Sequence, residues 1–234
     1  MTAKRRVSPV TGKEIWTGGS ITNAELIRTF LNIILNVVDF VFNINKNQPS
    51  DINEHLISFR RYAEECDTII ETYKSRLQKA KVVDENNPIT SGKYNEKDRK
   101  SDTYFIPPDS ESEWIFRKLT DYIINANDNY FHFDLHGFEK IQFTRYKSSN
   151  DCFKNHVDAG PNDIRKLSLS IQLSDPKEYE GGELCINDSP DPQVCPNDLG
   201  TIILFPSYTS HEVKPVTKGT RYSLVAWVEG PPFR

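Results

Sequence analysis

The feature that most limits the fold of this 234-residue chain is a change in the spacing of its apolar residues. Between Glu54 and about Lys81 they recur every three or four positions, which predicts an amphipathic helix. From Tyr130 onward apolar and polar residues alternate, most clearly over residues 167–173, which predicts strands. A helical first half followed by seven or eight short strands predicts an α+β fold, with helices packed on a sandwich or barrel.

The segments around this repeat carry weaker signals. Pro and Gly residues in 1–20 predict an irregular arm, and residues 84–101 have the charged, turn-rich character of a surface loop. Thr22 to Glu25 and Ser110 to Glu113 both have the form of a capping box, which opens a helix. The first helix would run to about residue 42, although its β-branched residues leave a strand near its end open. The chain is thus predicted to hold an N-terminal extension (1–50) of unknown role and one domain (51–234), with helices within 54–127 and strands within 130–230.

Composition excludes some classes of function. The formal net charge is -4 and no basic run is present, so we expect no nucleic-acid partner. The most apolar segment, Leu26 to Phe42, is shorter than the roughly 20 residues of a membrane span, and Asn and Asp residues interrupt it at regular intervals. We therefore expect no membrane association. Four scattered cysteines without a Cys-x-x-Cys pair predict free thiols and a cytoplasmic location, and whether Cys185 and Cys195 interact stays open.

Two histidines and one aspartate are candidate metal ligands. His156 and Asp158 stand two positions apart, so on a strand their side chains point the same way and can reach one ion. His211 would complete a face of two imidazoles and one carboxylate, the set that binds Fe(II) and leaves positions open for other ligands.

A second His-x-Asp motif, His132 to Asp134, is followed by His136. On a strand His132 and His136 would stand roughly 13 Å apart at about 3.3 Å per residue, too far to share an ion. We therefore interpret this motif as a polar strand face beside the core, with a local ligand role as the alternative.

Ten residues after His211 stands Arg221, with a Pro-Val-Thr-Lys-Gly turn signal (215–219) between them. Strands on either side of this turn could form a hairpin that brings Arg221 near His211. A guanidinium binds a carboxylate in two-pronged fashion, so Arg221 is a candidate for holding an acidic co-substrate.

These motifs together resemble the prolyl-4-hydroxylase-like family of 2-oxoglutarate/Fe(II) dioxygenases, and especially its PKHD-type hydroxylase branch. The resemblance spans about residues 54–230 and is carried by the following segments: Arg99–Ser101, Ala126–Asn127, His156–Asp158, Leu167–Ser170, Leu173–Pro176, Tyr179–Leu184, Phe205–Ser207 and His211–Arg221. It implies a double-stranded β-helix, or jelly-roll, core over 130–230 with supporting N-terminal helices.

The resemblance also implies roles for single residues. His156, Asp158 and His211 match the Fe(II) ligands, and Arg221 matches the residue that pairs with the far carboxylate of 2-oxoglutarate. Tyr146 matches a tyrosine that binds the same co-substrate. Gln172 stands where relatives can have a second tyrosine, and Ser170, two residues before it, is a further candidate. No protein base or nucleophile is required.

The implied activity is hydroxylation of an unactivated C–H bond with Fe(II), 2-oxoglutarate and O2, and with ascorbate as an optional reductant. The first expectation for the substrate is a prolyl residue of a peptide or protein. The alternatives are a small-molecule metabolite or a sensor module that binds metal and 2-oxoglutarate without turnover. The sequence differs from this family at two places that are expected to change the entrance to the active site. Phe153 replaces a frequent tyrosine, and the loop 159–163 is short. Substrate identity, oligomeric state and pathway stay open.

Overall fold

The computed structural model describes residues 4–7, 14–17, 52–81, 95–160, 163–187 and 191–232. The predicted helix over 22–42 and most of the predicted loop over 84–101 lie outside these ranges. The chain divides into two compact units, residues 1–35 and 36–234. The predicted boundary after residue 50 stays a prediction.

The first unit contains two antiparallel strands, β1 (Lys4–Val7) and β2 (Glu14–Thr17), with Lys4 opposite Thr17. The prediction of an irregular arm over 1–20 is therefore wrong at these positions. Ile15 and Trp16 favour extended backbone, and this preference outweighs the Pro and Gly residues on which the prediction relied.

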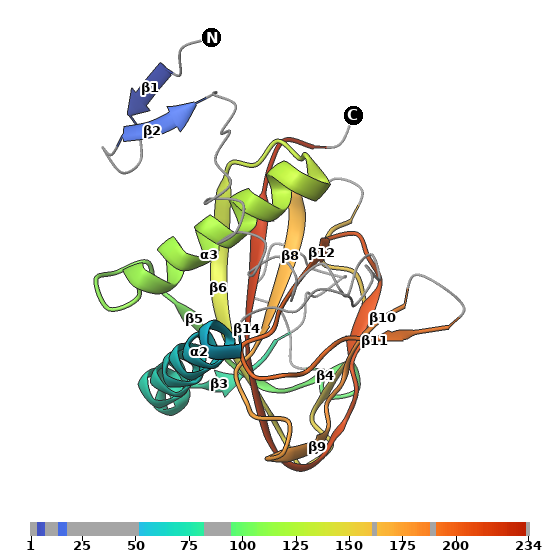
Figure 1. Cartoon of the computed structure of the whole chain (residues 1–234). Coiled ribbons are helices and arrows are strands. Elements are labelled where there is room, and N and C mark those ends of the chain that lie inside the picture. Colours follow the sequence, from blue (N-terminus) through green and yellow to red (C-terminus); the bar gives the residue numbers. More distant parts are fainter. Residues whose placement is uncertain are drawn as a thin grey trace. The chain divides into compact units, whose positions relative to one another are not determined.

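The second unit consists of two antiparallel sheets and a few helices (Figure 1). The larger sheet has the order β12-β8-β14-β6-β5-β3, with β9 paired to the start of β14. Its strands are β3 (Gln78–Lys79), β5 (Asp102–Ile106), β6 (Gly137–Lys147), β8 (Arg165–Gln172), β9 (Tyr179–Gly181), β12 (Ile202–Pro206) and β14 (Val216–Glu229). The smaller sheet has the order β11-β10-β13-β7-β4. Its strands are β4 (Arg99–Lys100), β7 (Cys152–His156), β10 (Leu184–Ile186), β11 (Gln193–Val194) and β13 (His211–Val213).

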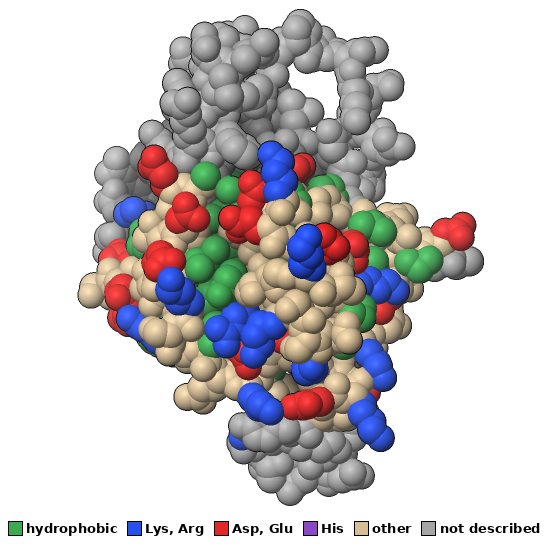
Figure 2. All heavy atoms as spheres, turned by 90° about the horizontal axis from the view of Figure 1, so that it is seen from below, with side chains coloured by type: hydrophobic (Ala, Val, Ile, Leu, Met, Phe, Trp, Pro, Cys, Tyr) green, Lys and Arg blue, Asp and Glu red, His purple; other side chains and the backbone are tan. Residues whose placement is uncertain are grey.

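The helices lie across one side of the larger sheet (Figure 1). They are α2 (Ile52–Tyr73), the 3-10 turn η1 (Lys74–Arg76), α3 (Glu113–Ala126) and the π-helical turn η2 (Asn127–Phe131). Among the described residues, no helix is long and apolar enough to cross a membrane. On the face shown in Figure 2, basic and acidic side chains are interspersed around a group of hydrophobic ones.

The predicted alternation is confirmed in β8, and it sorts the side chains of this strand between two cores. Leu169 and its apolar neighbours in β8 face the helices, in a cluster that also holds Ile115 and Leu119 of α3. The intervening Ser168, Ser170 and Gln172 lie on the other face of the strand. A second cluster, including Tyr146 of β6 and Leu184 of β10, fills the space between the two sheets. Polar residues of β8 are therefore buried between the sheets.

Helix boundaries differ from the predicted ones. The helix predicted over 54–81 ends at Tyr73, because Leu77 is extended and β3 pairs with β5. The helix α3 is confirmed, but the capping box over Ser110 to Glu113 is wrong. Ser112 is the N-cap and makes no side-chain capping bond, whereas the Asp109 carboxylate accepts hydrogen bonds from two backbone amides in this turn.

Strand boundaries also differ. No strand begins at Tyr130, because α3 continues into η2 and His132 adopts a left-handed backbone (φ 55°). The chain enters β6 only at Gly137, so the His132 to Asp134 motif is not a strand face.

Candidate metal centre

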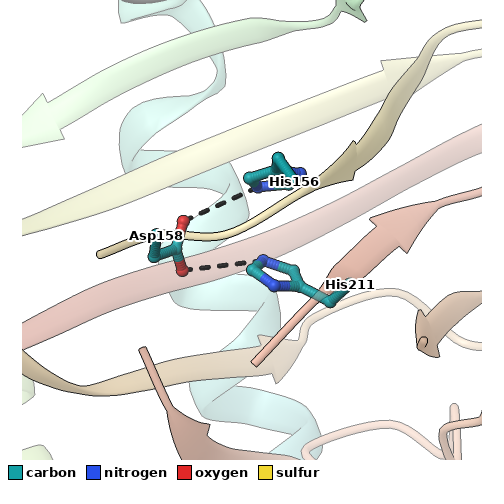
Figure 3. Close-up of side chains that lie close together, drawn as sticks. All are labelled: His156, Asp158 and His211. Atoms are coloured by element: carbon teal, nitrogen blue, oxygen red, sulfur yellow. Dashed lines mark ion pairs between the residues drawn. The ribbon is translucent and has the colours of Figure 1, made fainter. Parts of the chain in front are cut away.

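Three candidate ligands converge where the paired central strands β7 and β13 of the smaller sheet end and begin (Figure 3). His156 ends β7 and stands directly opposite His211, which begins β13, while Asp158 follows β7 by two residues. One ligand atom from each of the three side chains lies within 4.8 Å of the others, the arrangement needed to share one ion. Among the described residues this is the only such group, and it excludes His132, Asp134 and His136.

Both imidazoles are oriented by the backbone. The Nδ1 atom of His156 lies 2.7 Å from the carbonyl of Lys154, and that of His211 lies 2.9 Å from the carbonyl of Thr209. A proton on each Nδ1 satisfies these carbonyls and leaves the Nε2 lone pair free. Each Nε2 faces Asp158, at 3.6 Å from Oδ1 for His156 and 3.5 Å from Oδ2 for His211. The donor set thus has the tautomers that metal binding requires.

The Asp158 carboxylate is held by buried hydroxyls. Its Oδ2 accepts a hydrogen bond from Ser168 Oγ at 2.6 Å, and Ser168 lies 3.0 Å from the hydroxyl of Ser207. Burial would raise the pKa of the Asp158 carboxyl, but the contact with His156, the charge of His211 and the Ser168 hydroxyl outweigh burial and hold this pKa below its usual range. Burial lowers the pKa of His211. Asp158 is therefore anionic and His211 neutral at neutral pH, as ligands must be.

Arg221 is a buried cation without a counter-charge. Its side chain is 3% exposed, no carboxylate of the described residues pairs with its guanidinium, and Nη1 has no hydrogen-bond partner among them. Leaving such a charge uncompensated in the interior is costly. The guanidinium lies at a cavity between the sheets that is also lined by the following residues: Ser170, Gln172, Leu184, Cys195 and Asn197. This cavity is suited to an anion.

Tyr146 connects the two ends of this site. It stands opposite Arg221 in the pairing of β6 with β14, and its ring centre lies 5.6 Å from the Arg221 guanidinium carbon. Burial raises the pKa of Tyr146, while the charges of Arg99 and Arg221 lower it and that of Asp158 raises it. Its side chain therefore lies within electrostatic range of both the metal ligands and the buried arginine.

The predicted hairpin between His211 and Arg221 is wrong. Among the described strands, β13 pairs with β7 and β10, whereas β14 pairs with β6, β8 and β9. The segment predicted as a turn lies largely inside β14, which begins at Val216. The chain passes from one sheet to the other before this strand. Arg221 and His211 thus share the space between the sheets because the sheets face each other.

Arg99, Ser168 and Ser207 were not predicted as site residues from the sequence. The Arg99 guanidinium carbon lies 4.5 Å from the ring centre of Phe153, and that ring stacks on His156 at 3.6 Å. A signal for Ser168 was present, because a small polar residue recurring on the inner face of a buried strand needs a partner there. All four cysteines are free thiols, so no bridge joins Cys185 and Cys195.

The sequence of this chain is similar to a known family of oxygenases. Residues 141–229 match the family model of the 2OG-Fe(II) oxygenase superfamily. A PKHD-type hydroxylase of Gloeothece citriformis is 41% identical over 93 residues, which are 38% of this chain and 42% of that protein. A PKHD-type hydroxylase of Verminephrobacter eiseniae is 34% identical over 93 residues, covering 36% of this chain and 41% of that protein. The chain thus matches about two-fifths of the length of these relatives, and the resemblance seen in the sequence is confirmed.

Solved structures share the fold. A prolyl hydroxylase of Trichoplax adhaerens, in complex with a peptide fragment of hypoxia inducible factor, superposes with a TM-score of 0.65 at 16% identity, over 90% of this chain and 94% of that one. A prolyl-4-hydroxylase of Pseudomonas putida gives a TM-score of 0.58 at 18% identity, over 73% and 86%. The α+β class is confirmed at the level of antiparallel sheets covered by helices.

Proposed function

We propose that this chain, a relative of the PKHD-type hydroxylases of the 2OG-Fe(II) oxygenase superfamily, is a 2-oxoglutarate-dependent dioxygenase that hydroxylates a C–H bond. One observation carries the proposal. Two oriented imidazoles and an ionised carboxylate meet at one point, a guanidinium without a counter-charge lies at the cavity between the sheets, and Tyr146 is within electrostatic range of Asp158 and Arg221.

In this proposal His156, Asp158 and His211 hold Fe(II). Three protein ligands leave coordination positions for a co-substrate and O2. When bound, the metal and 2-oxoglutarate together activate O2, and the protein orients the reactants and excludes water. Carbonyl groups of β7 and of the segment before β13 hold the imidazoles with their Nε2 atoms toward Asp158, so that all three side chains could bind one ion.

Arg221 binds the far carboxylate of 2-oxoglutarate, and this anion supplies the missing counter-charge. Ser170 and Gln172 line the same cavity and contribute polar contacts along the co-substrate. Tyr146 lies against the Arg221 guanidinium and contributes a hydroxyl. We also propose that the two facing sheets form the double-stranded β-helix of this family, with residues 51–234 as the catalytic domain.

The proposed substrate is a prolyl residue of a peptide or protein. Support comes from the PKHD-type relatives and from the fold shared with a prolyl hydroxylase that holds a peptide fragment. Support also comes from the surface beside the ligands, where Val157 is 49% exposed and Tyr208 is 56% exposed. These two side chains offer apolar contacts to a polypeptide. The alternatives are an enzyme that hydroxylates a small-molecule metabolite and a sensor module that binds metal and 2-oxoglutarate without turnover. A cytoplasmic location remains a prediction.

The test is succinate formation by purified protein with Fe(II), 2-oxoglutarate and ascorbate, in the presence and absence of proline-containing peptides. We expect peptide-dependent succinate and a peptide mass increased by one oxygen atom. Asp158→Ala should abolish both, and Arg221→Ala should raise the KM for 2-oxoglutarate strongly. Arg145→Ala is the matched control, because Arg145 pairs with Asp102 away from the cavity.

Each alternative has its own result. Succinate formed only with free amino acids or other metabolites would assign a small-molecule substrate. Binding of metal and 2-oxoglutarate without turnover under any condition would favour the sensor. Normal turnover by Asp158→Ala would refute the ligand assignment.

A further inference from the structure

Tyr179 of β9 lies beside the proposed co-substrate cavity without lining it, and its hydroxyl is surrounded by donors. The side chain is 6% exposed, and Gln172 Nε2 donates a hydrogen bond to the hydroxyl oxygen at 2.5 Å. The Asn197 amide and the Arg221 guanidinium also approach this oxygen. Three nitrogen groups that border the cavity thus meet at one phenol.

The backbone around Tyr179 is built to bring it against Arg221. Tyr179 stands opposite Gly219 where β9 pairs with β14. Gly182 follows on the same segment with φ +71°, and a Cβ at this position would lie 3.1 Å from Arg221 Cδ and 3.7 Å from the Tyr179 ring. Both side chains therefore lie near the Gly182 backbone, and a Cβ there would also lie 2.7 Å from Val216 Cγ2, so the positive φ and the close neighbours favour glycine at this position.

The chemistry of the cluster points to an anion. The described residues supply amide and guanidinium donors here but no carboxylate that pairs with Arg221. The Tyr179 oxygen accepts from one amide hydrogen of Gln172, which fixes the carboxamide plane and leaves its second N–H available. A fixed amide beside a fixed guanidinium matches a carboxylate in a defined position.

We propose that Tyr179 is the positioning residue of the co-substrate site, acting through Gln172 and Arg221 to hold their donors for the distal carboxylate of a 2-oxo dicarboxylic acid. This inference rests on the proposed function. Tyr179 selects for a dicarboxylic co-substrate, because the groups it orders contact only the end of the molecule that a 2-oxo monoacid lacks. The contacts of Tyr179 described above involve none of the three candidate metal ligands, so we expect metal affinity not to depend on it.

The experiment measures the dissociation constant of 2-oxoglutarate for the Mn(II)-loaded protein by calorimetry. Tyr179→Phe should weaken 2-oxoglutarate binding by about tenfold, the effect of one hydrogen bond that supports a charged contact. The affinities for Mn(II) and for 2-oxobutyrate, which has no distal carboxylate, should stay at the wild-type level. In turnover assays the KM for 2-oxoglutarate should rise, with kcat at saturation unchanged.

Two further variants sharpen the test. Tyr222→Phe is the matched control, because Tyr222 follows Arg221 on β14 but stacks on Phe143 in the helix-side core, and it should leave binding unchanged. Gln172→Leu removes the same hydrogen bond from its other side and covers the case in which Tyr179→Phe does not fold. Since both changes break the Tyr179–Gln172 hydrogen bond, the double variant should weaken binding by less than the two single effects combined.

The outcomes separate the two proposals. Wild-type affinity in Tyr179→Phe, alongside lost affinity in Arg221→Met, overturns the role of Tyr179 and leaves the enzyme assignment intact. Equal weakening of 2-oxoglutarate and 2-oxobutyrate also overturns it, because that pattern indicates general damage to the site. Absence of 2-oxoglutarate binding to the metal-loaded wild-type protein overturns both proposals.

Discussion

Replacement of Ser168 by alanine removes the hydroxyl that holds the Asp158 carboxylate, a proposed metal ligand. Ser168 Oγ donates to Asp158 Oδ2 at 2.6 Å and is itself linked to Ser207 at 3.0 Å. Both serines are fully buried, so water cannot replace the lost group without rearrangement. The carboxylate would keep its charge but lose the contact that fixes its rotation.

The expected magnitude follows from two independent estimates. A hydrogen bond to a charged group contributes about 1.5–3 kcal/mol. Loss of a partner that orients a metal ligand typically lowers metal affinity by about 10–100-fold, equivalent to about 1.4–2.7 kcal/mol. The two ranges agree, so we expect Ser168→Ala to weaken metal binding by about 10–100-fold.

The assay is calorimetric titration of the metal-free protein with Mn(II). Ser174→Ala is the control, because the Ser174 hydroxyl is also buried but accepts a hydrogen bond from the backbone of Tyr222, away from the ligands. It should bind Mn(II) like the wild type. Affinity of Ser168→Ala within about twofold of the wild type would refute the reasoning, since that difference is below the effect of one oriented hydrogen bond.

Three further predictions concern packing, stability and pH. Gly182→Ala should raise the KM for 2-oxoglutarate while Mn(II) affinity is kept, because the positive φ of 71° strains an alanine and its methyl would lie 2.7 Å from Val216 Cγ2 and 3.1 Å from Arg221 Cδ, which shifts the side chains beside the cavity. Leu169→Ala, on the opposite face of the same strand from the serines, should lower the free energy of unfolding by about 2–5 kcal/mol in denaturant titrations, with little change in metal affinity. The pKa of His211 is lowered from 6.5 in the folded state, so the unfolded chain binds a proton at this imidazole more readily than the folded chain does. The contribution of His211 to the free energy of unfolding is therefore present above pH 6.5 and is lost as the pH falls below 6.5. Denaturant titrations of the metal-free protein should show this loss, and His211→Gln should reduce the slope.

The candidate ligand set could be predicted from the sequence because its signals are local. His156 and Asp158 stand two apart, and β8 alternates strictly, so the inner face of this strand could be assigned without coordinates. The hairpin prediction failed because the Pro and Gly residues of 215–219 mark a crossing between sheets and a bulge as readily as a turn. Which strands pair is decided by contacts between distant segments, and no local signal encodes them.

The same limit applies to the cluster around Tyr179. Two successive glycines, Gly181 and Gly182, indicate no more than a bend in the sequence, and the position of Gly182 next to Arg221 depends on the pairing of β9 with β14. The role of Asp109 at the start of α3 was missed for a different reason. Asp109 and the capping box of Ser110 to Glu113 are both possible caps at the start of this helix. In the structure the Asp109 carboxylate accepts the backbone amides of this turn.

The long strand β14 pairs with three other strands, and its side chains enter both the core beneath the helices and the space between the sheets. Its even-numbered Leu224 and Ala226 complete the core under the helices, and Arg221 points to the opposite side. A slip of one residue in its pairing would carry the guanidinium into the hydrophobic layer and push leucine into the anion cavity. An insertion or deletion in β14 would therefore disrupt the core and the proposed co-substrate site together, whereas point substitutions can separate the two.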